Sequence, residues 1–81
     1  MPRTASAAAA HIGQRIVGSR QKIALTQDEL AAISGIDSSN IRAYENGRAM
    51  PSVHSLVRIA SALGLEPGVL LEGVTPELFG G

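Results

Sequence analysis

Four neighbouring side chains near the middle of the chain share one face of a predicted helix. The helix is expected over residues 38–45, with Ile41 and Tyr44 turned inward one helical turn apart. Its outward positions are then Ser38, Ser39, Arg42 and Ala43. Arginine forms two parallel hydrogen bonds with guanine, serine donates or accepts one, and alanine contacts the methyl group of thymine. Arg42 is therefore the main candidate for a base contact; the alternatives are a phosphate contact or an ion pair with Glu45.

A pair of short helices would position these side chains. Thr26 begins a capping-box sequence at the start of a helix predicted over residues 27–34. Asp37 can cap the following helix, and Gly35 lies between the two, where helices often end in a left-handed residue. Two helices joined by a short glycine-containing turn are typical of the helix-turn-helix, whose second helix enters the major groove of DNA.

Polar residues around this helix pair are candidates for phosphate contacts. They are Gln27, Asn40, Asn46, Arg48 and Ser52. Gln27 belongs to the first turn of its helix, where backbone N–H groups and a long amide can meet one phosphate. The alternatives are an ordinary exposed glutamine, a helix-ending role for Asn46 and a capping role for Ser52.

The composition excludes several classes of protein. The 81 residues form one small domain, whose core must be aliphatic because Tyr44 and Phe79 are the only aromatic residues. The absence of cysteine excludes disulfides and thiolate metal sites, and we predict no metal and no cofactor. No nucleophile motif or phosphate-binding glycine loop indicates an enzyme. No apolar run reaches the roughly 20 residues of a membrane span. The absence of cysteine fits a reducing cytosol, and with the predicted helix-turn-helix we expect a cytoplasmic protein associated with DNA.

The net charge of zero counts against a nucleic-acid partner, because many nucleic-acid-binding proteins are strongly basic. The charges are, however, unevenly distributed. Residues 1–48 contain six basic and four acidic side chains, a net charge of +2, whereas residues 49–81 contain one basic and three acidic side chains, a net charge of −2. A positive face near the helix-turn-helix is therefore compatible with a neutral protein.

The hydrophobic spacing predicts an all-α chain with five helices. Their expected bounds are residues 7–22, 27–34, 38–45, 53–63 and 67–72. Residues 1–6 are expected to form a flexible arm, which could contact DNA through Arg3. Residues 7–73 are expected to form the folded domain, and residues 74–81 a tail.

Several segments, in this order and spacing, resemble the Cro/C1-type (XRE) family of phage and bacterial repressors. They are Thr26–Ala31, Ser34–Ile36, Ile41–Arg48, Pro51–Ser52 and Ile59–Leu65. The resemblance covers about residues 10–73. It implies a compact five-helix lambda-repressor-like domain, with helices two and three as the helix-turn-helix. It also implies a transcriptional regulator, in most cases a repressor, that binds a palindromic operator as a homodimer.

The resemblance assigns further roles to individual residues. Base contacts in the family fall at the positions of Ser38, Ser39, Arg42 and Ala43. Many members carry glutamine where this chain has Ser38 and Ser39, so water-mediated contacts and DNA shape should contribute more to recognition here. The family also pairs an arginine late in the first helix with a glutamate late in the recognition helix. Arg20 and Glu45 match those positions, and we expect a partly buried ion pair.

The C-terminal segment contains more apolar residues than a small monomer requires. They are Leu70, Leu71, Val74, Leu78 and Phe79. A two-fold DNA-binding protein needs a dimer contact, and this segment is our predicted dimer surface. The alternatives are that the tail packs onto its own core, or that it binds another protein, as in antitoxins and other partner-regulated helix-turn-helix subunits.

Overall fold

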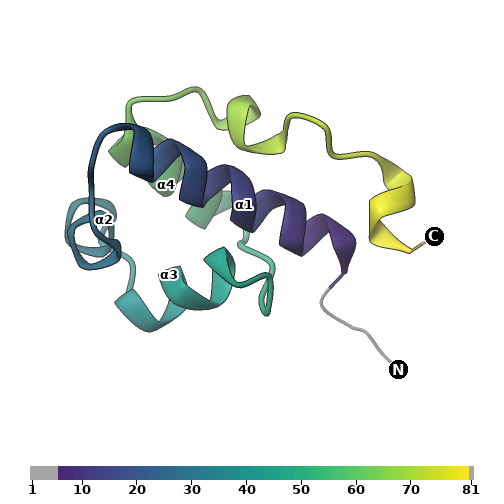
Figure 1. The fold of residues 1–81 in the computed structure, drawn as a ribbon, viewed down its shortest axis with the longest axis horizontal. Coiled ribbons are helices and arrows are strands. Elements are labelled where there is room, and N and C mark those ends of the chain that lie inside the picture. The colour runs from purple at the N-terminus through teal and green to yellow at the C-terminus, as the bar shows by residue number, and fades with distance from the viewer. Residues whose placement is uncertain (1–5, 81) are drawn as a thin grey trace.

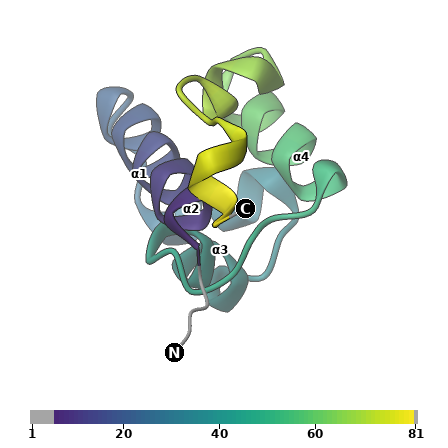
Figure 2. The ribbon, with the colours of Figure 1, turned by 90° about the vertical axis from the view of Figure 1, so that its right-hand side faces the viewer.

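The computed structural model describes residues 6–80. Within this range it contains four α-helices and two short 3-10 helices: α1 (Ala7–Lys22), α2 (Gln27–Ser34), α3 (Ser38–Glu45), α4 (Val53–Leu63), η1 (Pro67–Leu71) and η2 (Pro76–Phe79). Figures 1 and 2 show α3 on one side of α1 and η1 on the opposite side. None of the helices in residues 6–80 is long and apolar enough to cross a membrane. Most of the predicted arm, including Arg3, lies outside the described residues.

The four α-helices begin and end at the residues predicted from sequence, because local capping groups fix their ends. The caps of α1 to α4 are Ser6, Thr26, Asp37 and Ser52, and each side chain accepts a hydrogen bond from a backbone N–H in the first turn. Gly35 and Gly64 end α2 and α4 in the left-handed conformation, with φ of 73° and 72°. Each helix is therefore delimited by its own sequence.

The core is aliphatic and draws on every α-helix. Its largest fully buried side chains are Ile12, Ile16, Leu30, Ile41, Ile59 and Leu70. Tyr44 is partly buried against this cluster, and its hydroxyl lies 3.4 Å from the Ser55 hydroxyl. Because Ile41 and Tyr44 both face this core, the opposite face of α3 is turned toward solvent.

The predicted fifth α-helix is wrong, because the segment Pro67–Leu71 is a 3-10 helix. Five residues without a side-chain cap cannot sustain α-helical hydrogen bonding, whereas 3-10 helices are common at this length. A residue of α1 also competes for the carbonyl groups: Arg15 donates from Nε and Nη2 to the Val69 carbonyl at 3.1 and 2.9 Å. The second 3-10 helix, η2, was not predicted.

The structure divides the five apolar residues of the C-terminal segment between core and surface. Leu70 is fully buried in the chain's own core, so its assignment to a dimer surface is wrong. Val74 is partly buried against the same core, and Leu78 is half-buried in η2, which contacts α1. Leu71 and Phe79 are 41% and 55% exposed. Only these last two present large apolar surfaces to solvent.

Candidate nucleic-acid interface

The two faces of α3 differ sharply in burial. Ile41 and Glu45 are buried on its inward face. The outward side chains proposed for base or phosphate contact, all at least partly exposed, are Ser38, Ser39, Asn40, Arg42 and Ala43. The helix thus presents a continuous polar surface whose single charged group is Arg42, with no large apolar side chain on it.

A close approach of two backbones holds α3 against α1. A Cβ atom at Gly13 of α1 would overlap the carbonyl oxygen of Tyr44 and lie 2.8 Å from that of Glu45. A Cβ atom at Gly47, which follows α3 with φ of +74°, would lie 2.9 Å from the Cα atom of Ala10. Glycine at these two positions lets the end of α3 lie directly on α1.

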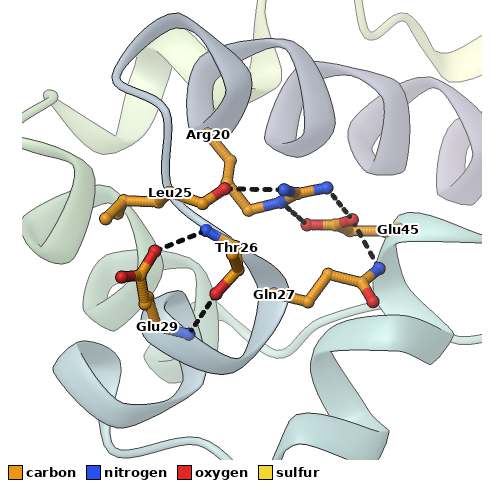
Figure 3. Close-up of polar contacts among 6 residues, drawn as sticks. All are labelled: Arg20, Leu25, Thr26, Gln27, Glu29 and Glu45. Carbon is orange, nitrogen blue, oxygen red and sulfur yellow. Dashed lines mark hydrogen bonds and ion pairs between the residues drawn. The ribbon is translucent and has the colours of Figure 1, made fainter.

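The ion pair between Arg20 and Glu45 is present at the same crossing (Figure 3). Arg20 donates from Nε to Glu45 Oε2 at 2.7 Å and from Nη2 to Oε1 at 2.9 Å, a bidentate contact. Its Nη1 donates to the Leu25 carbonyl at 2.8 Å. The side chains are only 12% and 3% exposed. The hydrogen bond to Glu45 raises the pKa of Arg20, which favours the charged guanidinium.

Gln27 joins this ion pair from the start of α2. Its Nε2 donates to Glu45 Oε1 at 2.8 Å, while Thr26 and Glu29 form the capping box of the same helix (Figure 3). The carboxamide proposed for a phosphate contact is therefore already hydrogen-bonded within the protein. The groups still suited to a phosphate are the second hydrogen on Nε2 and the first-turn backbone N–H groups of α2 other than that of Glu29, which donates to the Thr26 hydroxyl.

The start of α3 has its own hydrogen-bonded cap. Asp37 Oδ1 accepts from the Ser39 backbone N–H at 2.8 Å and from the Ser39 hydroxyl at 2.7 Å. These two bonds, with a smaller contribution from the charge of Arg42, lower the pKa of Asp37. Ser39 therefore stabilises the start of α3 and also lies on the candidate interface.

The remaining phosphate candidates flank α3. Asn46 and Arg48 are exposed just after its end, and the Asn46 backbone N–H closes the helix on the Arg42 and Tyr44 carbonyls. Ser52 is exposed and caps α4 by accepting from the Ser55 N–H at 3.0 Å. Both Asn46 and Ser52 thus have structural roles that leave their exposed surfaces accessible.

Arg42 has an acidic neighbour that sequence reasoning did not identify. Its Nη2 lies 3.5 Å from Oδ1 of Asp28 in the first turn of α2, with side chains 47% and 79% exposed. The alternative partner considered from sequence, Glu45, is engaged by Arg20 and Gln27 instead. Asp28 is separated from Arg42 by 14 positions along the chain, so no helical spacing rule could have paired them.

A second unpredicted contact fixes the far end of α2. Arg58 of α4 donates from Nε to the Ser34 carbonyl at 3.0 Å and from Nη2 to the Gly35 carbonyl at 3.4 Å. A cation at the carbonyl end of a helix satisfies unpaired acceptors and complements the helix dipole. Arg58 therefore fixes the turn between α2 and α3 to α4, while the Arg20–Glu45 pair fixes the end of α3 to α1.

This combination of a short turn, a capped outward helix and a rigid connection to the first helix defines a helix-turn-helix protein. A family model described as helix-turn-helix matches residues 19–70, more than half of the chain. The chain belongs to this helix-turn-helix family, which confirms its resemblance to Cro/C1-type proteins.

Three similar proteins illustrate this relationship. An uncharacterized HTH-type transcriptional regulator, y4dL of Sinorhizobium fredii, is 41% identical over 56 residues, which are 69% of this chain and 29% of that protein. The crystal structure of the restriction-modification controller protein C.AhdI from Aeromonas hydrophila has a TM-score of 0.75 and 34% identity, covering 76% of this chain and 94% of that one. The P22 c2 repressor with a synthetic operator has a TM-score of 0.71 and 29% identity, covering 76% and 94%.

The chain covers only part of the first curated relatives. It spans between 29% and 52% of the length of three of them, including y4dL. These relatives are named as transcriptional regulators or repressors, which are not enzymes.

Proposed function

We propose that this protein is a transcriptional regulator, acting as a repressor, that binds DNA with α3 in the major groove. Ser38, Ser39, Arg42 and Ala43 contact base edges in this proposal. Phosphate contacts come from Gln27, Asn40, Asn46, Arg48 and Ser52. The protein binds a palindromic operator as a homodimer, so that one α3 from each subunit reads one half-site.

One observation carries this proposal: α3 is rigidly held through its inward face while its outward face is polar and unobstructed. Burial of Ile41 and the bidentate Arg20–Glu45 pair fix the helix, and Arg42 remains 47% exposed on the opposite side. A preorganised helix loses little conformational entropy on binding. The operator-bound state of the similar P22 c2 repressor supports the same use of the fold.

Replacement of Arg42 by alanine tests the base contact. A bidentate arginine–guanine contact is worth about 1–3 kcal/mol of discrimination, so Arg42→Ala should weaken binding to a selected genomic fragment by about 5-fold to 150-fold. Binding is measured by fluorescence anisotropy at two salt concentrations. The control is Lys22→Ala, which removes an exposed cation bordering the groove between α1 and η1 and should change specific affinity far less.

Two outcomes would contradict the interface. If the wild-type protein fails to bind any fragment at low salt, where non-specific contacts are strongest, DNA binding is refuted. If Lys22→Ala weakens specific binding as much as Arg42→Ala does, Arg42 has no special role in reading bases.

The proposed homodimer should depend on the exposed apolar residues of the C-terminal segment. We expect Phe79→Ser to raise the dimer dissociation constant by about tenfold, because about 1–3 kcal/mol of apolar burial is lost when a buried aromatic side chain becomes polar. Analytical ultracentrifugation over a concentration series measures the change. Val53→Ser on α4, where the side chain is 78% exposed, is the control for a general loss of surface apolarity.

The same measurement separates this dimer from its alternatives. If Val53→Ser weakens the dimer and Phe79→Ser does not, the subunits meet through α4. If the wild type stays monomeric at all concentrations, the homodimer is refuted. The exposed side chains of Leu71 and Phe79 would then support the alternative that this segment binds another protein.

A further inference from the structure

We infer that Asp28 is a positioning residue that holds the Arg42 side chain for a base contact and thereby raises the sequence specificity of α3. This inference rests on the proposed DNA-binding function. Asp28 lies in the first turn of α2 and Arg42 on the outward face of α3, with Oδ1 and Nη2 3.5 Å apart. The contact connects the two helices on the surface proposed to meet DNA.

The other acidic side chains of the helix-turn-helix have internal partners. Glu29 closes the capping box, Asp37 caps α3 through Ser39, and Glu45 binds Arg20. For Asp28, by contrast, the structure records no hydrogen bond within residues 6–80, and its charged neighbour there is Arg42. A carboxylate in the first turn also complements the dipole of α2, but that role requires no contact with α3.

The geometry of a guanidinium group allows Asp28 and guanine to bind Arg42 together. The group has two edges that each present a pair of N–H donors, and each hydrogen on Nη2 belongs to a different edge. The Asp28 carboxylate, 3.5 Å from Nη2, can therefore attract one edge and leave the opposite edge complete for the two acceptors of guanine. A move of the side chain toward a phosphate would break the contact with Asp28.

The charge of Asp28 gives this arrangement a consequence for specificity. A carboxylate on a DNA-facing surface repels phosphates, so it weakens binding to every sequence. A DNA sequence that places guanine opposite Arg42 offsets this repulsion, because Asp28 holds Arg42 in the orientation that binds guanine. Other sequences gain nothing from that orientation. Asp28 should therefore lower non-specific affinity while increasing the ratio of specific to non-specific binding.

The test compares Asp28→Asn, which removes the charge and keeps the shape, with Glu66→Gln as the matched control. Glu66 is exposed and directly precedes η1, the element that lies on the side of α1 opposite to α3 (Figures 1 and 2). Selection from random DNA with the wild type first defines a preferred site. Each protein is then titrated against that site, against the site with its contacted guanine replaced, and against unrelated DNA.

We expect Asp28→Asn to bind unrelated DNA severalfold more tightly than the wild type and to lose about twofold to fivefold of its discrimination at the guanine position, the range typical of an exposed ion pair. Glu66→Gln should retain the discrimination of the wild type. In an Arg42→Ala background, Asp28→Asn should leave discrimination unchanged, because the group that Asp28 positions is absent. Asp28→Ser, with a residue suited to helix starts, should reproduce the effect if the fold is intact.

The outcomes separate this inference from the proposed function. If the wild type enriches a motif and Asp28→Asn keeps the same discrimination, Asp28 does not position Arg42, although DNA binding stands. If Asp28→Asn reduces discrimination equally in the Arg42→Ala background, Asp28 acts by another route and the inference is wrong. If the wild type enriches no motif, the proposed function fails and the inference fails with it.

Discussion

Glu45→Ala should lower the free energy of unfolding by about 3–5 kcal/mol, the typical cost of removing one partner of a buried ion pair. The substitution leaves the guanidinium of Arg20, whose side chain is 12% exposed, without its bidentate acceptor. It also removes the acceptor of the Gln27 carboxamide. Since a domain of this size has a total stability of about 5–10 kcal/mol, the variant should melt at a much lower temperature. Urea unfolding followed by circular dichroism measures the loss.

The control for this substitution is Glu77→Ala in η2, an exposed carboxylate whose removal should change stability by less than about 0.5 kcal/mol. A double-mutant cycle with Arg20→Ala then isolates the pair. We expect a coupling energy of about 2 kcal/mol, because each single variant leaves the other charge unpaired. Losses that simply add in the double variant would show that Arg20 and Glu45 stabilise the fold independently.

Gly13→Ala should destabilise the protein by about 3 kcal/mol and lower the melting temperature on the order of 15 °C. The added Cβ would meet the carbonyl oxygens of Tyr44 and Glu45, which are backbone atoms and cannot rotate away. The substitution would therefore force α3 away from α1. The cost of this displacement exceeds the stability of about 1 kcal/mol that alanine adds to an isolated helix. Differential scanning calorimetry gives the shift directly.

Gly18→Ala, five residues further along the same helix, is the matched control with the opposite expected sign. No atom lies within 4 Å of a Cβ built at Gly18, so alanine should stabilise α1 by roughly 1 kcal/mol. If both substitutions stabilise the protein, the close crossing of α1 and α3 does not depend on glycine. If both substitutions destabilise the protein, the higher helix propensity of alanine does not determine the effect of Gly18→Ala on stability.

The sequence predicted the four α-helices because their limits depend on neighbouring residues. Thr26 and Asp37 cap helices whose first turns they precede directly, and Gly35 ends α2 through its own left-handed conformation. The segment after Gly64 has Pro67 and Gly73 where a helix can begin and end, but it has no side-chain cap. There the hydrogen bonds from Arg15 to the Val69 carbonyl, across 54 positions, accompany a 3-10 helix where an α-helix was predicted.

The candidate site was predictable in part for the same reason. The outward positions of α3 follow from helical spacing once Ile41 is placed in the core. The contacts of Gln27, Asp28 and Arg58 were missed because each connects two elements whose relative positions only the tertiary fold determines. Gly13 illustrates this limit: by helix propensity alone a glycine only weakens α1, whereas the structure shows the contact with α3 that requires it.

The separation of the two faces of α3 has a consequence for how such a protein can diverge. Ser38, Arg42 and Ala43 contribute no fully buried side chain, so they can be exchanged with little loss of folding stability. If they contact bases as proposed, evolution or design can change the DNA target through them. Ser39 is the exception, because its hydroxyl donates to the Asp37 carboxylate that caps the helix. A change of target at that position therefore has to keep threonine or serine, or compensate the lost hydrogen bond elsewhere in the protein.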